Sequence, residues 1–352
     1  MKLIRTVDAE GTVLCHDITQ IIKGVTKDAV FRKGHIVTKE DIPVLLSVGK
    51  DMLYVWEKEE GMLHENDAAE VLCELCRGAH MSRSEAKEGK IELKAECDGL
   101  LKVDHAGMKA INGFGQMMIA SRHGNFAVKK GDKLAGTRLI PLVIEEVKLA
   151  AAREAAMQAT GGHPILELKP FVHKKAGIVT TGNEVYYGRI QDTFTPVIRE
   201  KLAEYDTEVI GHTVWNDDDK KVTAAILELI DQGADIVCCT GGMSVDPDDK
   251  TPLAIRNTGA RIVSYGAPVL PGAMFLLAYY EVKEGPNPRT AVIMGLPGCV
   301  MYAKRTIFDL VLPRVMADDP VTPEELAALG AGGLCLGCSV CTFPNCGFGK
   351  GW

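Results

Sequence analysis

The 352-residue sequence has no apolar run long enough to cross a bilayer. Its longest such run, LPGAMFLLAYY, is too short for a spanning helix, which needs roughly 20 residues. The opening MKLIRTVDAEG carries basic residues but no apolar h-region, because Asp8 and Glu10 interrupt it. We therefore expect no signal peptide and no membrane association, and predict a cytoplasmic protein.

Positive charge is also in short supply. The formal net charge is −7 at pH 7, from 40 Lys and Arg against 47 Asp and Glu. A general nucleic-acid binder carries a basic face, so this balance argues against nucleic acid as a partner. The nucleotide motif GxxxxGK[ST] is absent, as is a GxGxxG after a first strand. The remaining composition, 46% hydrophobic and 25% charged, is that of a globular protein with two or three domains.

Cysteine, in contrast, is abundant, with 11 residues. The last four, Cys335, Cys338, Cys341 and Cys346, fall within the short segment CLGCSVCTFPNC. In a reducing compartment such a cluster more often binds metal than forms disulfides. Four thiolates surrounded by glycines suit Zn²⁺ or an iron–sulfur cluster, and the spacing alone leaves both open. The alternative is a flexible tail whose cysteines stay reduced.

The pattern of elements divides the chain into four parts. Residues 1–150 show short alternating strands and turns, and we predict a β-rich accessory module there. Within it, Asn66 or Asp67 is predicted to cap a helix that ends near Gly78. Residues 151–173 form a helical linker, because AAAREAAMQATGG combines strong helix formers with terminal glycines. Residues 174–317 repeat strand, turn and helix, and residues 318–352 contain the cysteine cluster.

The strand–helix repeats of residues 174–317 predict an α/β domain with a doubly wound parallel sheet. Its strands end in the turns TGNE, WNDDD, GGMSVDPDD and GLPG, and a long helix from about Val300 to Met316 is predicted after the last turn. Right-handed crossovers place all four turns at the carboxyl edge of the sheet, where open α/β folds bind ligands. The sequence therefore predicts a binding site at this edge.

The residues of these turns favour a phosphate-bearing ligand. Gly241 and Gly242 allow close approach of the backbone, and Ser244, Thr181 and Gly182 add donors. Carboxylates beside phosphate imply Mg²⁺ between them. The carboxylates in question are Asp248, Asp249, Asp217, Asp218 and Glu184. These carboxylates also have structural alternatives. Asp217 and Asp218 precede a helix and can serve as N-caps, and Glu184 can be a solvated turn residue. Asp248 and Asp249 precede a helix too, so capping explains one of them but hardly both. Asp192, another candidate, can likewise be only the cap of the helix that follows it.

The region from Gly177 to about Arg314 resembles the molybdopterin-binding domain of molybdopterin molybdenumtransferases and molybdopterin adenylyltransferases. TGNE and GRIQDT match the family's TGDE and GxIxDTN, and NDD matches its RDD. GGMSVDPDDKT matches GGVSVGxxDYT, while PVLPGAM and GLPGCV echo PxxPGKP and GLPGNP. The sequence departs from the pattern at five positions: Phe194, Asp246, Ala273 and the pair Cys299–Val300.

The resemblance implies a molybdopterin-binding protein of molybdenum cofactor biosynthesis, leaning towards an enzyme that inserts metal into free or adenylylated molybdopterin with Mg²⁺. It assigns catalysis to Asp249, Asp248 and Glu184, with Asp249 as the metal ligand. The positions it assigns to ligand binding are Thr181, Gly182, Asp192, Asp217, Asp218, Gly241, Gly242, Ser244, Thr251, Pro271, Gly272, Gly295, Pro297 and Gly298.

Other functions remain open at this level. Loss of the Lys at Ala273 favours a non-catalytic carrier or insertion chaperone that delivers the cofactor to a molybdoenzyme partner. A redox or sensor protein built around the cysteine tail is a third interpretation. Molybdate and tungstate are both candidate metal sources, and the resemblance implies a homodimer.

Overall fold

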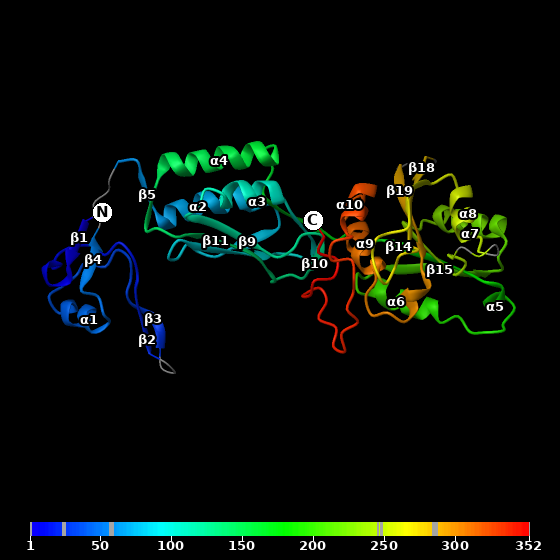
Figure 1. Cartoon of the computed structure of the whole chain (residues 1–352), viewed down its shortest axis with the longest axis horizontal. Helices are drawn as coiled ribbons and strands as arrows, with labels where there is room; N and C mark the ends of the chain where they lie inside the picture. The colour runs from blue at the N-terminus through cyan, green and yellow to red at the C-terminus, as the bar shows by residue number, and fades with distance from the viewer. Residues whose placement is uncertain are drawn as a thin grey trace. The chain divides into compact units, whose positions relative to one another are not determined.

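The computed structural model describes residues 2–22, 26–55, 60–244, 246, 249–283 and 288–351 (Figure 1). The chain forms two compact units. The first unit comprises residues 1–96, 103–122 and 130–168, and the second comprises residues 97–102, 123–129 and 169–352. The part of the chain that is described contains no helix long and apolar enough to cross a membrane.

The first unit begins with two small antiparallel strand pairs. These are β1 (Lys2–Arg5) with β4 (Met52–Val55) and β2 (Ile18–Ile22) with β3 (Thr26–Phe31). A 3₁₀ helix η1 (Thr6–Asp8) and helix α1 (Asp41–Ser47) accompany them. A small core of buried Leu14, Ile18, Leu45 and Leu53 holds this part together.

The rest of the first unit is an antiparallel sheet covered by helices. Its strand order is β6 (Met81–Arg83), β7 (Lys90–Ala95), β11 (Lys133–Leu139) and β9 (Met117–Ser121). Helices α2 (Glu65–Cys76) and α3 (His105–Asn112) lie over the sheet, and α4 (Glu146–Thr160) packs on the outside of these two helices (Figure 1). Strand β5 (Met62–His64) pairs with β12 (Val143–Glu145). Helix α4 ends at Thr160 and is capped by Gly161, which lies in the left-handed region with φ 66°, as the terminal glycines predict.

The second unit is built on a six-stranded sheet of order β15-β14-β16-β19-β18-β17. The strands are β14 (Lys175–Thr181), β15 (Glu208–Trp215), β16 (Ile236–Thr240), β17 (Arg261–Tyr265), β18 (Leu276–Val282) and β19 (Arg289–Leu296). The first four in spatial order are parallel, and the other two are antiparallel.

Helices cover both faces of this sheet, which confirms the predicted doubly wound α/β fold. On one face, α6 (Phe194–Ala203) and α9 (Ile307–Met316) share a buried cluster with the sheet. On the other, α7 (Asp219–Asp231) and α8 (Thr251–Asn257) share a second cluster. The remaining helices are the short α5 (Asn183–Tyr186), the 3₁₀ helix η2 (Gly298–Met301) and α10 (Pro323–Ala328). A separate three-stranded sheet has the order β10 (Phe126–Val128), β8 (Gly99–Val103) and β13 (Leu166–Pro170).

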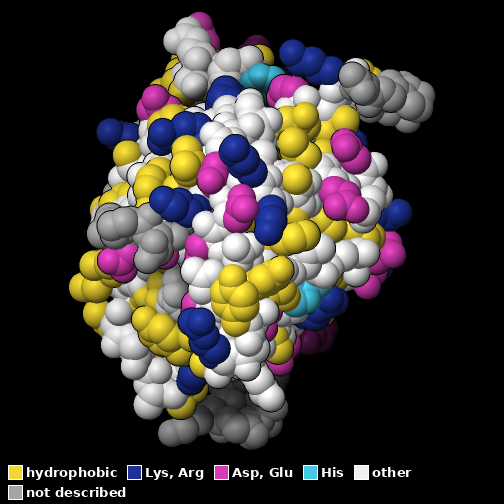
Figure 2. Space-filling view, turned by 90° about the vertical axis from the view of Figure 1, so that its right-hand side faces the viewer, with side chains coloured by type: hydrophobic (Ala, Val, Ile, Leu, Met, Phe, Trp, Pro, Cys, Tyr) yellow, Lys and Arg dark blue, Asp and Glu magenta, His cyan; other side chains and the backbone are white. Residues whose placement is uncertain are grey.

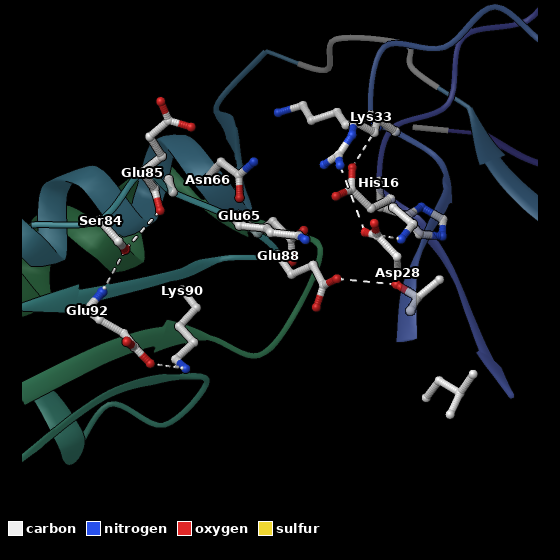
Figure 3. A pocket seen from close by; sticks show the side chains of 17 residues that line it. His16, Asp28, Lys33, Glu65, Asn66, Ser84, Glu85, Glu88, Lys90 and Glu92 are labelled. Carbon is white, nitrogen blue, oxygen red and sulfur yellow. Dashed lines mark hydrogen bonds and ion pairs between the residues drawn. The ribbon is translucent and has the colours of Figure 1, made fainter. Parts of the chain in front are cut away.

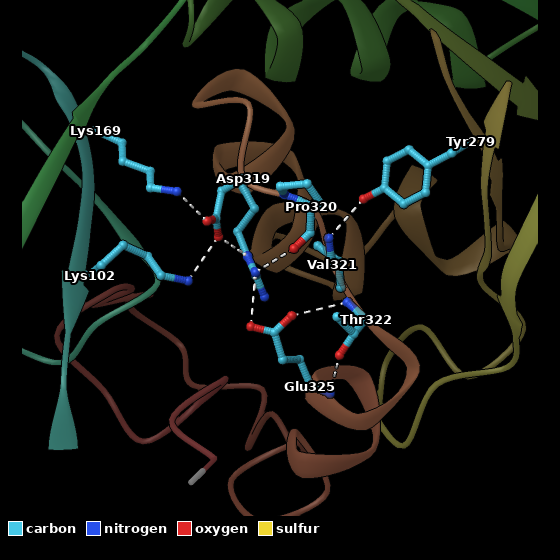
Figure 4. Close-up of polar contacts among 9 residues, drawn as sticks. Lys102, Lys169, Tyr279, Asp319, Pro320, Val321, Thr322 and Glu325 are labelled. Atoms are coloured by element: carbon cyan, nitrogen blue, oxygen red, sulfur yellow. Dashed lines mark hydrogen bonds and ion pairs between the residues drawn. The ribbon is translucent and has the colours of Figure 1, made fainter. Parts of the chain in front are cut away.

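The segment after α9 is fixed by a buried ionic cluster around Asp319 (Figure 4). The Asp319 carboxylate accepts hydrogen bonds from Lys102 (2.8 Å), Lys169 (2.8 Å) and the Nε of Arg314 (2.6 Å). Arg314 also donates to the carbonyl oxygen of Pro320 (2.8 Å). This cluster ties strands β8 and β13 to the end of α9.

Two helix starts differ from the sequence prediction. Helix α9 begins at Ile307 rather than near Val300, because Thr306 and Asp309 form a capping box there. Helix α2 begins at Glu65, where the His64 side chain accepts the N–H of Asn66. The antiparallel strands β17 and β18 were not part of the predicted sheet.

Candidate ligand-binding site

The four turns predicted to carry a site leave the sheet at one level. Thr181 and Trp215, the last residues of β14 and β15, are partners in register. Thr240, which ends β16, pairs with Thr180 and with Leu296, the end of β19. The turns therefore lie at a common carboxyl edge. Figure 2 shows the side on which α5 lies, where hydrophobic and charged side chains are interspersed.

The glycine turn after β16 packs directly on the end of β14. Gly241 has φ 82°, and a Cβ there would lie 2.1 Å from the carbonyl oxygen of Thr181. Gly242 has φ 53°, and its Cβ would lie 2.9 Å from Oγ1 of Thr251. The Thr251 hydroxyl donates to the carbonyl oxygen of Gly241 (2.9 Å) and lies 3.0 Å from Oγ1 of Thr181. Thr181 and Thr251 are buried, so they shape the turn from beneath.

Asp249 closes the same turn. Its Oδ2 accepts the backbone N–H of Ser244 at 2.7 Å, and its own N–H donates to the carbonyl oxygen of Asp246 at 2.9 Å. The hydroxyl of Tyr265 donates to the carbonyl oxygen of Met243 (3.0 Å), and burial together with the Asp249 charge raises the pKa of Tyr265. Asp248, the other predicted acid of this turn, lies outside the described residues.

A cavity of about 520 Å³ opens between this turn and the segment after β19. Its lining consists of Phe194, Gly241, Gly242, Met243, Ser244, Asp249, Ala273, Met274, Leu296, Pro297, Gly298, Cys299, Met301 and Tyr302. Six of these were predicted as site residues: Gly241, Gly242, Ser244, Asp249, Pro297 and Gly298. The described lining residues include one carboxylate, that of Asp249, and no Lys or Arg. The cavity therefore combines backbone amides and one acid with largely apolar walls.

The turns after β14 and β15 lie next to each other but outside that lining. The N–H of Asn183 donates to Oδ2 of Asp217 (3.0 Å), and the N–H of Gly182 donates to the carbonyl oxygen of Trp215 (3.2 Å). The Glu184 carboxylate lies against Gly182, 2.9 Å from where a Cβ would stand. Asp218 is the N-cap of α7 and accepts the N–H groups of Lys220 and Lys221.

Asp192 is held by a polar network at the start of α6. Its Oδ1 accepts the N–H groups of Phe194 (2.9 Å) and Thr195 (3.1 Å), as an N-terminal cap does. Its Oδ2 accepts the hydroxyls of Thr195 (2.6 Å) and Thr180 (2.9 Å), with Nε2 of His212 at 3.3 Å. Burial raises the pKa of Asp192, but these hydrogen bonds outweigh it and hold the pKa below its usual range. Asp192 therefore joins α6 to β14.

Two other predicted glycines, Gly272 and Gly295, pack closely behind the cavity walls. A Cβ on Gly272 would lie 2.6 Å from Cγ2 of Ile307, and one on Gly295 would lie 2.6 Å from Cε of Met243. Both glycines therefore permit close packing behind the wall. Pro271 lines a different cavity, which contains the cysteine tail.

Sequence reasoning did not find the apolar walls. Met274, Met301 and Tyr302 line the cavity, and Tyr302 is 78% exposed. The motif GLPG identifies the turn before Met301 and Tyr302 but does not indicate which following side chains face the ligand. In the sequence, only the apolar side chains of PVLPGAM and CVMY could have indicated that these segments form the cavity walls.

The four tail cysteines line one cavity of about 450 Å³. Cys338 and Cys341 are exposed, whereas Cys335 and Cys346 are half-buried. Among the described residues, no three His, Cys, Asp or Glu side chains converge as the ligands of a metal ion. The four cysteines of the predicted site therefore line one cavity, but their sulfur atoms do not converge as the ligands of a metal ion.

The first unit contains a larger cavity, of about 860 Å³, that the sequence did not predict (Figure 3). Side chains of both signs line it, including Arg32, Lys33, Glu65 and Glu88. Burial and the neighbouring Glu88 raise the pKa of Glu65, whereas burial and Lys50 lower that of His16, which also lines the cavity. A lining of mixed charge selects neither anions nor cations, so we assign no ligand to this cavity.

Comparisons with known proteins identify two segments. Residues 177–317 match the family described as "Probable molybdopterin binding domain", and residues 3–57 match a domain of unknown function, DUF8806. A CinA-like protein of Mycobacterium avium is 39% identical over 93 residues, which are 26% of this chain and 21% of that protein. A CinA-like protein of Mycobacterium tuberculosis is 36% identical over 93 residues, 26% of this chain and 22% of that protein. The chain thus spans about a fifth of the length of these relatives.

Among solved structures, the tungsten cofactor synthesizing protein MoaB of Pyrococcus furiosus aligns with 36% of this chain and 84% of its own, at 24% identity and a TM-score of 0.31. A putative molybdenum cofactor biosynthesis protein of Corynebacterium diphtheriae aligns with 45% of this chain and 100% of its own, at 19% identity and a TM-score of 0.32. Scores this low support no inference about function. The family match and the ordered turns at the sheet edge do identify the domain: residues 177–317 of this chain form a member of the molybdopterin-binding domain family.

Proposed function

We propose that the second unit binds molybdopterin in the 520 Å³ cavity at the carboxyl edge of its sheet. The observation that carries this proposal is the joint lining by the glycine turn, Asp249 and the Pro297–Gly298 turn within the family domain. The glycine backbone suits a phosphate, and the apolar walls with Tyr302 suit a flat pterin ring. Ligand sites commonly combine apolar walls with a few polar groups in this way.

We infer Mg²⁺-dependent insertion of metal into free or adenylylated molybdopterin as the reaction. Mg²⁺ commonly binds one or two protein carboxylates together with substrate phosphate oxygens, and Asp249 supplies one such carboxylate in the cavity. Bound Mg²⁺ would offset phosphate charge and polarise an anhydride. Asp249 would hold the ion, the glycine turn would position the phosphate, and Tyr302 would shield the ring from water.

A specific observation favours a second candidate, a non-catalytic carrier or insertion chaperone. Ala273 occupies the wall position at which the resemblance implies Lys, and the described lining residues include no Lys or Arg. Without a fixed positive charge, the cavity has less means of stabilising charge that develops on an anionic leaving group. A carrier needs affinity for the cofactor but no such stabilisation.

Release of AMP separates the two candidates. The purified chain is mixed with adenylylated molybdopterin, Mg²⁺ and molybdate or tungstate, and AMP is followed over time. Release that requires Mg²⁺ and falls in Asp249→Asn supports the enzyme. Saturable binding of the pterin without AMP release supports the carrier.

The other expected partners belong to this proposal. We propose a cytoplasmic homodimer that receives molybdate or tungstate and passes its product to a molybdoenzyme. Support for the dimer comes from the family resemblance, and support for a delivery role comes from the carrier candidate.

A further inference from the structure

The cysteine tail is an irregular segment with firmly attached ends. At its start, the N–H of Cys335 donates to the carbonyl oxygen of Leu270 (2.8 Å), and Leu334 forms a β-bridge with Leu270. At its end, the N–H of Gly349 donates to the carbonyl oxygen of Gly332 (2.9 Å), and Phe348 is buried. The chain between these anchors contains no helix or strand. A loop of this kind, fixed at both ends, can present several side chains to one point.

Those side chains include all four tail cysteines. The cavity of about 450 Å³ that they line also contains Leu334, Leu336, Phe348, Lys304 and Arg305. Lys304 Nζ donates to the carbonyl oxygen of Ser339, between Cys338 and Cys341, at 3.2 Å. Arg305 lies over the Phe343 ring at 5.3 Å and is paired with Glu204 and Asp309. The thiols therefore face a partly apolar cavity with cationic groups at its wall.

We propose that this cavity holds a [4Fe–4S] cluster bound by Cys335, Cys338, Cys341 and Cys346. The two successive CxxC spacings of the CxxCxxC run from Cys335 to Cys341 are typical of cubane clusters. Structural zinc sites more often use two ligand pairs set apart in the chain. The cavity is larger than one metal ion requires. A tetrathiolate cluster carries net negative charge, which the Lys304 ammonium would offset.

The thiols must close inward for this site to form. Cys338 and Cys341 are exposed, and no described set of three ligands converges without the cluster. Besides its anchors at Cys335 and Gly349, the loop is held between Cys338 and Cys341 by the hydrogen bond from Lys304 to Ser339, so the two exposed thiols must turn inward around this contact. On binding, each thiol loses its proton and forms one Fe–S bond. The described linings of this cavity and the 520 Å³ cavity have Tyr302 in common, and assembly of the cluster requires no pterin.

The test is anaerobic reconstitution of the full chain with iron salts, sulfide and dithiothreitol, followed by removal of unbound material. We expect about four iron and four acid-labile sulfide per chain and a broad visible absorbance. On the same samples, a thiol reagent should find about four fewer reactive cysteines with the cluster than after its removal. Binding of one Zn²⁺ per chain in a parallel titration, with no stable iron and sulfide, would overturn the cluster, as would no bound metal at all.

Variants locate the site. Cys338→Ser and Cys341→Ser are each expected to lose most of the iron and sulfide, while Cys97→Ser, which changes a half-buried cysteine outside the tail, keeps them. Thermal melting of each variant shows whether the α/β domain stays folded. The thiol count on wild-type protein tests the site even if a variant misfolds. Equal loss of iron in Cys97→Ser and Cys338→Ser would contradict the assignment to the tail.

Discussion

Gly241 occupies a position that tolerates no side chain. Its φ of 82° lies in the left-handed region, and a Cβ would meet the Thr181 carbonyl oxygen at 2.1 Å. A non-glycine residue in such a conformation costs about 1–3 kcal/mol before any clash is counted. We therefore predict that Gly241→Ala lowers the free energy of unfolding by at least that amount, measured in urea. Gly298→Ala is the matched control, because a Cβ there meets nothing within 4 Å, and it should leave stability nearly unchanged.

Asp249 is proposed to bind the ligand's Mg²⁺, whereas Asp218 caps helix α7, and variants of the two residues distinguish these roles. Asp249→Asn keeps an oxygen for the Ser244 N–H but removes the charge that would hold Mg²⁺. We expect weaker, Mg²⁺-independent pterin binding with little loss of stability. Asp218→Ala should do the opposite, costing about 1 kcal/mol of stability as the cap of α7 is lost while pterin affinity is kept. The two roles are assigned wrongly if Asp249→Asn only lowers the melting temperature.

At the scale of single residues, the sequence predicted local roles better than it predicted the cavity. Capping by Asp218 and cap-like contacts by Asp192 follow from acids placed before helices, and both are present. Whether Glu184 or Asp217 reaches the ligand depends on the path of neighbouring turns, which spacing does not determine. Both lie outside the cavity lining, while Met301 and Tyr302, without a polar motif of their own, lie within it.

At the scale of elements, the Asp319 cluster makes a pH-dependent contribution. Burial alone would raise the pKa of Asp319. Its contacts with Lys102, Lys169 and Arg314 outweigh this effect and lower the pKa from the ordinary 3.8 to about 2. Because the folded-state pKa lies below the unfolded one, the stabilisation is complete above about pH 4. It is lost as the pH falls towards 2, and it amounts to roughly 2 kcal/mol.

Asp319→Asn tests this contribution. The variant leaves three cations facing an uncharged amide, and we expect a loss of about 3 kcal/mol near neutral pH. The loss should shrink below pH 4, which urea unfolding at several pH values will measure. Asp318→Asn is the control, because that side chain is 63% exposed and its pair with Lys174 should contribute little. Equal losses in the two variants would show that burial around Asp319 is unimportant.

The order of strands and helices in the second unit was predictable because each buried strand ends in a recognisable turn. DIVCCT, for example, has no polar residue between Ile236 and Cys239, as expected of a strand covered on both faces. The antiparallel pairing of β17 and β18 was not predictable. Their sequences RIVSY and LLAYYEV are short, and nothing in them indicates the direction in which the two strands pair. The late start of α9 was missed because the capping box at Thr306 competes with an apolar run that begins earlier.

At the scale of the whole molecule, we predict a homodimer. The expectation rests on the family resemblance, and an isologous pair is the commonest symmetry among soluble oligomers. Light scattering coupled to size exclusion should give twice the chain mass of 38.1 kDa across a tenfold range of concentration. The monomer mass throughout that range would contradict the prediction.

Binding of molybdopterin to the carboxyl-edge cavity is the central claim, and an equilibrium titration of the full chain tests it most directly. Wild type should bind one pterin per chain saturably at micromolar protein. Gly298→Phe should weaken binding at least tenfold while staying folded by circular dichroism, because a side chain there has open space in which to fill the cavity. Arg32→Ala, in the charged cavity of the first unit, should bind as wild type does. No binding by folded wild type, or binding that is lost in Arg32→Ala and kept in Gly298→Phe, would contradict the claim.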